Sequence, residues 1–280
     1  MAHATDQILS LGVNLVSSLN ARPRLVPNTY FVRDGEFFHP TELARSPWHG
    51  NKWIAGGPTS CLLASCAEDP VLNERFAIAR FQLDIFGKVP NLPLTRSIRV
   101  LRDGEQTKLH CISLLAKGEV VAQAHILRVR RLATPDFAMP SNYPKPKDMP
   151  SGTVPELAQM GGSVSFRRVS GDPGVPGRAV WWMTMTDGEV IEGETPSNFV
   201  KACLFADFGH GFGNALRPLE WAMPNLDITV QFMRMPVGDW FLLDAETHTA
   251  GNGHGTAHTL FADEKGVYAR GLQTVFIAPR

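Results

Sequence analysis

An isolated carboxylate follows an apolar stretch in the segment FVKACLFADFGHGFGN, residues 199–214. If the apolar residues form a buried helix, Asp207 lies at the C-terminal end of that helix. Burial and the negative end of the helix dipole both raise the pKa of a carboxyl group there. A carboxylate with a raised pKa is a good general base when water reaches it. We therefore take Asp207 as the candidate catalytic residue; the alternative is a solvated carboxylate in an ordinary loop.

Two apolar segments predict the helices that would position this chemistry, GGPTSCLLASCAED in the first half of the chain and TPSNFVKACLFADFG in the second. The spacing from Pro58 to Asp69 equals the spacing from Pro196 to Asp207. Proline in the first turn favours a helix start. Because both segments are apolar nearly all round, each helix must be buried on every side.

Alternating runs rich in β-branched and aromatic residues surround each helix and predict antiparallel strands, with DG and KG dipeptides as hairpin turns. A proline-rich stretch separates two similar sets of elements. The sequence therefore predicts an α+β fold of two hotdog units in tandem, each an antiparallel sheet wrapped around a central helix. The expected divisions are an N-terminal hotdog at 1–132, a linker at 133–163 and a C-terminal hotdog at 164–280.

Composition excludes several classes of partner. The 280 residues include 27 basic and 27 acidic side chains, so no net charge attracts nucleic acid or an anionic membrane. The four cysteines show no CxxC spacing, which favours reduced thiols and a cytoplasmic location. The N-terminus lacks a basic region and a long apolar run, which argues against a signal peptide and a membrane span. We expect a short amphipathic helix there.

The order of four motifs resembles the acyl-CoA thioesterase II (TesB-like) family of double-hotdog enzymes: AGGPTSCLLA, the FAD that ends the second helix, NLDITVQFMRMP and GLQTVFIAPR. The resemblance spans nearly the whole chain. It implies hydrolysis of an acyl-CoA to a carboxylic acid and CoA, a role in fatty acid metabolism, no metal or redox cofactor, and a homo-oligomer. The family often has a histidine before the Gly-Gly pair; this chain has Ala55 there, so no role of that histidine is transferred.

The resemblance also implies three residues that hold the attacking water, here Asp207, Asn225 and Gln273. Gln273 shares its period-2 face with small and apolar residues, so we expect it to point inward; a structural hydrogen bond is the alternative role. Asn225 alternates with polar residues, and it points inward only if its strand bulges at the start. Gly56, Gly57 and Arg234 are candidate substrate-binding residues. Arg234 would meet a CoA phosphate or form a surface ion pair.

Matching the two halves predicts Asp69, Arg80 and His125 at the positions of Asp207, Asn225 and Gln273. A guanidinium group has no hydrogen-bond acceptor and would pair with the carboxylate rather than hold a nucleophilic water. We therefore expect one working site, in the second half, and a degenerate copy in the first.

Other motifs give weaker hypotheses. His248, His254 and His258 suggest zinc less strongly than a solvated turn, because no Cys or Glu stands at ligand spacing. Cys203 is expected in the core. No G-x-S-x-G is present, and neither glycine-rich stretch has the strand and helix that a dinucleotide site needs. Two alternative functions stay open: a non-catalytic acyl-thioester-binding protein, and a hotdog hydratase or dehydratase, although no D-x-N-P-x-H pattern occurs.

Overall fold

The computed structural model describes residues 28–47, 51–154 and 163–280 of the chain. The amphipathic helix expected at the N-terminus lies outside these residues.

The helices are α1 (Gly56–Ala67), α2 (Pro70–Arg75), α3 (Asn198–Ala206) and α4 (Gly209–Phe212), with short 3₁₀ turns η1 (Glu42–Ala44) and η2 (Pro146–Asp148). The strands before the linker are β1 (Thr29–Asp34), β2 (Phe37–Pro40), β3 (Phe76–Ile85), β4 (Leu94–Asp103), β5 (Thr107–Ala116) and β6 (Glu119–Arg130). The later strands are β7 (Ser151–Gly152), β8 (Val164–Ser170), β9 (Ala179–Met185), β10 (Glu189–Ile191), β11 (Trp221–Ala222), β12 (Asp227–Phe232), β13 (Phe241–Thr249), β14 (His254–Asp263), β15 (Gly266–Phe276) and β16 (Ala278–Pro279).

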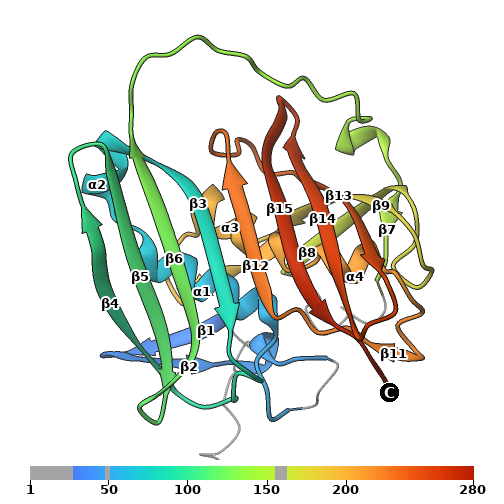
Figure 1. Ribbon diagram of the computed structural model, residues 1–280, viewed down its shortest axis with the longest axis horizontal. Coiled ribbons are helices and arrows are strands. Elements are labelled where there is room, and N and C mark those ends of the chain that lie inside the picture. Colours follow the sequence, from blue (N-terminus) through green and yellow to red (C-terminus); the bar gives the residue numbers. More distant parts are fainter. Residues whose placement is uncertain (1–27, 48–50, 155–162) are drawn as a thin grey trace, which may run out of the picture.

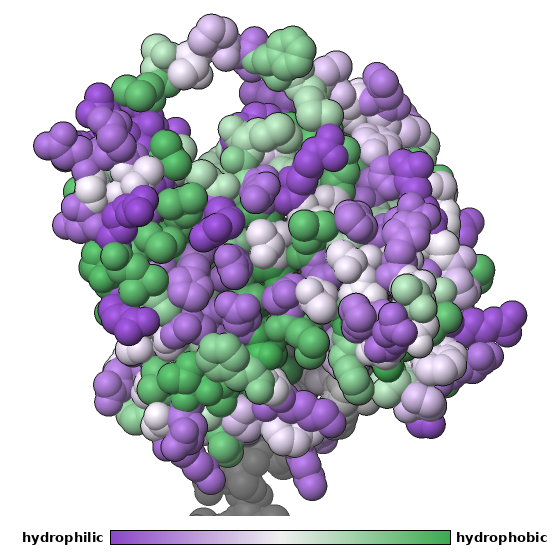
Figure 2. All heavy atoms as spheres, viewed as in Figure 1, coloured by the Kyte–Doolittle hydropathy of each residue, from purple (hydrophilic) through white to green (hydrophobic). Residues whose placement is uncertain are grey.

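One 14-stranded sheet runs through the described chain in the order β10-β1-β2-β4-β5-β6-β3-β12-β15-β14-β13-β9-β8-β7. Antiparallel pairing of β3 with β12, for example Phe81 opposite Val230, joins the two halves at the middle of the sheet. The sheet curves around the helices, which lie behind it in Figure 1. Its other face mixes hydrophilic and hydrophobic side chains, as expected for a surface turned to solvent (Figure 2).

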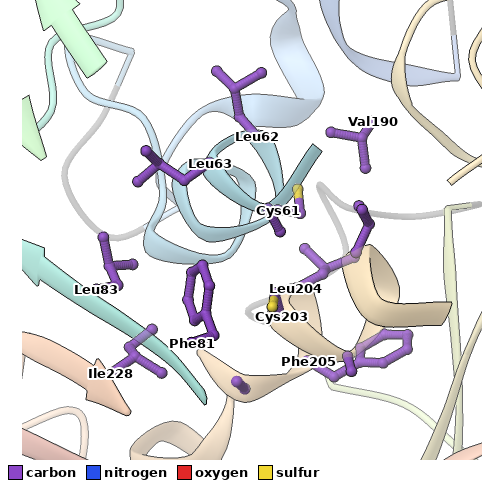
Figure 3. Close-up of a cluster of buried hydrophobic side chains, with 14 of the residues drawn as sticks. Cys61, Leu62, Leu63, Phe81, Leu83, Val190, Cys203, Leu204, Phe205 and Ile228 are labelled. Carbon is purple, nitrogen blue, oxygen red and sulfur yellow. The ribbon is translucent and has the colours of Figure 1, made fainter. Parts of the chain in front are cut away.

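The helices α1 and α3 pack against each other in opposite directions. The Ser60 hydroxyl of α1 donates to the Cys203 carbonyl of α3 at 2.7 Å. Around this contact, Leu62, Leu204 and Phe81 of β3 are fully or almost fully buried (Figure 3). Both predicted apolar helices are therefore present, and each covers the other as well as the sheet.

The strand prediction is wrong at one turn. Asp34-Gly35 and Lys117-Gly118 turn hairpins as expected. In contrast, the strands on either side of Asp187-Gly188, β9 and β10, do not pair with each other. β10 instead runs parallel to β1 of the first half, with Phe31 opposite Ile191.

The proline-rich segment arches from the end of β6 across the top of the view in Figure 1. It is then fixed to the outer face of the sheet. The Trp182 indole donates to the Pro144 carbonyl at 3.0 Å, and the Tyr143 hydroxyl donates to Asp244. In the described residues, every helix is too short or too polar to cross a membrane.

Candidate active site

Asp207 lies where the ends of two helices meet. It is the C-terminal cap of α3, and its carboxylate accepts a hydrogen bond from the Gly57 amide in the first turn of α1. A Cβ atom on Gly56 would overlap the carboxylate, so only glycine permits this approach. The helix dipole expectation was therefore incomplete: Asp207 lies at the negative end of its own helix and at the positive end of α1.

The electrostatic balance at Asp207 is dominated by burial. Desolvation raises the pKa of the carboxyl group above its ordinary value, while His210, the Asn225 amide and the Gly57 amide lower it in part. The residue is only partly buried. The carboxylate is thus more basic than a free aspartate, as a general base must be.

A bulge turns Asn225 toward this carboxylate. Asn225 bridges to Val275, whereas Thr229 pairs with Leu272, so the register slips by one residue between the two pairs. The Asp227 carboxylate accepts from the Thr274 amide at 2.7 Å within the irregular stretch. Asn225 therefore leaves the outward face that simple alternation predicts. Its Nδ2 donates to Asp207 Oδ1 at 2.7 Å.

Gln273 is buried on the inward face of β15 and caps the end of α3. Its Nε2 donates to the carbonyls of Ala206 at 3.1 Å and Asp207 at 3.4 Å. Its Oε1 accepts from the His210 amide at 2.8 Å. The two amide hydrogens are thus used by the protein, and Oε1 keeps a second lone pair for a further donor.

The sequence interpretation missed His210. This residue follows Asp207 by three positions in α4, and its imidazole interacts with the Asp207 carboxylate and the Gln273 side chain. Its Nδ1 is buried. The helical spacing of three from Asp207 was the signal available in the sequence.

Of the three candidate substrate-binding residues, the structure brings two to Asp207. Gly56 and Gly57 lie against the carboxylate. Arg234 lies beyond the opposite end of β12 from Asn225, and it forms an ion pair with the fully buried Asp263, with Nη2 at 2.7 Å from Oδ1. Arg234 therefore forms an ion pair, but with a buried carboxylate rather than at the surface; contact of Arg234 with a CoA phosphate stays a prediction.

The match of the first half was wrong in register. Asp69 caps α2 by accepting from the Leu72 amide at 3.0 Å, so Glu68 is the residue that caps α1 as Asp207 caps α3. His125 does not share the inward face of Ile126, and its Nδ1 is 3.9 Å from Asp84 Oδ2. Arg80 falls just after the bulge rather than at it.

The two halves match when they are aligned at their bulges, one in β3 and one before β12. The register slips between Ile78 and Arg80 in β3, as it does after Asn225. Counted from these bulges, Ile78 takes the place of Asn225 and Ile126 the place of Gln273. Both isoleucines are buried.

The buried Arg128 caps the end of α1 in the first half, where its Nη2 donates to the Ala67 carbonyl at 2.5 Å. Within the described part of the chain, no three His, Cys, Asp or Glu side chains are grouped to hold a metal ion. His248 and His258 contact each other as rings, 6.2 Å between centroids.

Two family models match the chain. Models of the N-terminal and C-terminal domains of acyl-CoA thioesterases match residues 44–129 and 139–277. No curated protein matches the chain.

Solved structures give the fold. A putative thioesterase from Novosphingobium aromaticivorans is 21% identical with a TM-score of 0.64, covering 88% of this chain and 98% of its own. A hot dog protein of unknown function from Alicyclobacillus acidocaldarius is 17% identical with a TM-score of 0.64, covering 88% and 94%. The acyl-CoA thioesterase II TesB2 from Mycobacterium marinum is 18% identical with a TM-score of 0.60, covering 81% and 90%.

These likenesses show a hotdog fold. Because the two domain models together match most of the sequence, the chain belongs to the acyl-CoA thioesterase family and is a thioester hydrolase.

Proposed function

We propose that this protein hydrolyses an acyl-CoA to a carboxylic acid and free CoA, with a water molecule as the nucleophile and Asp207 as the general base. The observation that supports this most is the partly buried Asp207 carboxylate, held by the amides of Asn225 and Gly57. In the reaction, water transfers a proton to Asp207 while its oxygen bonds to the thioester carbon. The C–S bond then breaks, and the proton passes from Asp207 to the departing thiolate.

Two side chains orient this water in the proposal. Asn225 holds Asp207 Oδ1, which fixes the plane of the carboxylate. Gln273 Oε1, with one lone pair used by the His210 amide, accepts the second hydrogen of the water. General-base assistance of this kind is worth about 10² to 10⁴ in rate.

The first turn of α1 supplies the positive end of a helix beside the reacting atoms. Backbone amides in a first turn have no partner within their own helix. The carbonyl oxygen of the thioester gains negative charge in the transition state, and this helix end stabilises it. Gly56 and Gly57 contribute by bringing the backbone close.

A direct attack by water also fits the state of the cysteines. Burial raises the pKa of Cys61 and Cys203 well above the ordinary value of a thiol, and that of Cys66 to about 11. Such thiols stay protonated at neutral pH and are poor nucleophiles. A covalent acyl-cysteine is therefore not part of the proposal.

We further propose that the chain is a double hotdog, with units at 1–132 and 164–280 joined by the linker at 133–163, and that only the second unit is active. The isoleucines at the Asn225 and Gln273 positions of the first unit support this, because they cannot orient a water. A homo-oligomer stays part of the proposal. Exposed Ile98, Val100 and Leu101 on β4 are its support.

The test is release of free thiol from a medium-chain acyl-CoA, with an enoyl-CoA hydration assay run beside it. We expect thiol release by the wild type and its loss in Asp207→Ala. Binding of acyl-CoA without thiol release would favour the acyl-binding protein, and hydration of the enoyl-CoA would favour the hydratase. Full hydrolytic activity in Asp207→Ala would reject Asp207 as the base.

A further inference from the structure

Two loops from the first half of the chain lie beside the proposed active site. The loop at 51–55 leads directly into Gly56, whose backbone lies against the Asp207 carboxylate. The loop at 86–93 follows β3 at the place where β3 pairs with the start of β12, next to Asn225. It lies at the lower end of β3 in Figure 1. Both loops are therefore neighbours of the site.

Hydrogen bonds and a cation–π contact join these loops. The Asn91 amide donates to the Lys52 carbonyl at 2.9 Å, and Trp53 bridges to Pro90 as in an antiparallel sheet. The Lys88 ammonium lies 5.7 Å from the centroid of the Trp53 ring, within the range of cation–π attraction. The joined loops therefore carry both lysines on adjacent stretches of backbone.

The positive charges of the two lysines are not neutralised by an acid of the described chain. Lys52 and Lys88 are exposed, and neither has an ion pair or a side-chain hydrogen bond to any residue that the structure describes. Neither loop contains an Asp or a Glu. In contrast, Arg45, which bridges to Ile54, is paired with Glu42. The lysines thus leave positive charge available to an anion.

An exposed aromatic ring stands next to Lys88 in the sequence. Phe86 is 60% exposed and contacts no other aromatic ring among the described residues. Exposed aromatic rings are stacking surfaces for nucleobases, and lysine ammonium groups bind phosphates. We name the side chains of Lys52, Trp53, Phe86 and Lys88 the loop platform. The loop platform offers both contacts that a phosphorylated nucleotide needs.

Resting on the proposed function, we infer that the loop platform binds the nucleotide end of acyl-CoA. Lys52 and Lys88 bind its phosphates. Trp53 fixes the Lys88 ammonium, and Phe86 stacks on the adenine ring.

The position of the loop platform suits the length and the charge of this substrate. Gly57 is five residues from Lys52, at most about 18 Å along an extended chain, and the pantetheine arm between the thioester and the phosphates can span such a gap. The separation also keeps the phosphate charges away from Asp207, because nearby like charges disfavour an ionised carboxylate. Arg234 lies beyond the other end of β12, so the loop platform and Arg234 are separate candidates for the phosphates.

The double variant Lys52→Ala/Lys88→Ala tests the loop platform with two substrates, a medium-chain acyl-CoA and the acyl-pantetheine with the same acyl group. KM for the acyl-CoA should rise about tenfold, as for the loss of one charge-assisted hydrogen bond. The value of kcat should not change, because the contact is equal in the ground state and the transition state. KM for the acyl-pantetheine, which lacks the nucleotide, should not change. The matched control Lys147→Ala/Lys265→Ala removes the same charge from two exposed lysines elsewhere and should change neither KM.

A second readout does not depend on hydrolysis. Adenosine 3′,5′-bisphosphate carries the base and phosphates of CoA without the pantetheine arm, and its binding is measured by calorimetry. The wild type should bind it, with an affinity that falls as the salt concentration rises. Lys52→Ala/Lys88→Ala and Phe86→Ala should each bind it about tenfold more weakly, and the lysine control should bind it as the wild type does.

An unchanged KM for acyl-CoA in Lys52→Ala/Lys88→Ala, or an equal rise of KM for both substrates, would overturn the inference. Binding of the bisphosphate that is not weakened in this variant would overturn it as well. If the wild type hydrolyses neither substrate but binds the bisphosphate through these lysines, the proposed function fails and the nucleotide site stands. If the wild type hydrolyses both substrates and the double variant behaves like its control, the inference about the loop platform fails alone.

Discussion

The C-terminal ends of α1 and α3 have the same arrangement of a capping acid but differ in the side chain that binds the last carbonyl of the helix. Each helix is capped by an acid that faces the start of the other helix: Glu68 accepts from the Ser197 hydroxyl at 2.7 Å, and Asp207 accepts from the Gly57 amide. The neighbouring strands differ. Arg128 binds the last carbonyl of α1 with a fixed positive charge, whereas the neutral Gln273 binds that of α3.

In the proposed function, this difference separates the helix end that Arg128 stabilises from the helix end at which Asp207 activates water. A guanidinium group at the C-terminal end of a helix complements the helix dipole and saturates the free carbonyl. A glutamine saturates the carbonyls without neutralising the adjacent carboxylate, and its oxygen can still accept a hydrogen bond. Burial raises the pKa of Asp207, and the Gln273 oxygen beside it can accept a further hydrogen bond.

Among changes that keep the Asp207 carboxylate, the largest effect is expected from closing the approach between the helices. Gly56→Ala places a methyl group against the Asp207 carboxylate, and a displacement of the base by about 1 Å costs about 10² in rate. Thiol release should fall by at least this factor. The control Gly87→Ala, where a Cβ has no neighbour within 4 Å, should keep wild-type kcat/KM. Normal hydrolysis in Gly56→Ala would show that the carboxylate need not sit there.

A smaller effect is expected at the bulge. Asn225→Leu removes the amide that favours the charged form of Asp207, so the pKa of Asp207 rises. The acid limb of kcat/KM should move to higher pH, and the plateau should fall by roughly tenfold or more because the carboxylate plane is no longer fixed. Ile78→Val, at the corresponding place of the first half, should lower stability by about 0.5–1.5 kcal/mol and leave both features unchanged. A shift of the limb to lower pH in Asn225→Leu would contradict this role.

The smallest effect on catalysis is expected at the end of α1. Arg128→Met leaves the Ala67 carbonyl without its donor, which should lower the free energy of unfolding by about 1–3 kcal/mol. Thermal unfolding should show this loss, and kcat per folded molecule should not change. Arg130→Met, exposed at the end of the same strand, should change neither quantity. A large loss of kcat in Arg128→Met would mean that the first half takes part in the reaction.

Much of the fold was predictable because the buried faces of helices and strands place apolar residues at regular intervals in the sequence. The apolar helices and most hairpins follow from helical apolar patterns and from period-2 alternation. The parallel pairing of β10 with β1 was not predictable, since it joins segments more than 150 residues apart. No local pattern specifies such a partner.

Local sequence patterns also predicted only some of the site residues. Asp207 and the inward face of Gln273 could be read from local pattern. Asn225 required a bulge, and a one-residue slip in either half reverses which side chains face inward. For that reason the first half was matched to Arg80 and His125 rather than to buried isoleucines.

The most direct test compares two isosteric changes at equivalent helix ends, Asp207→Asn and Glu68→Gln, by kcat/KM for acyl-CoA hydrolysis. Each removes one carboxylate and keeps its shape. We predict that Asp207→Asn lowers kcat/KM by about 10² to 10⁴, whereas Glu68→Gln stays within about twofold, as is usual for a change that removes no transition-state contact. Equal losses in the two variants, or an Asp207→Asn enzyme as active as the wild type, would contradict a single water-activating site at the end of α3.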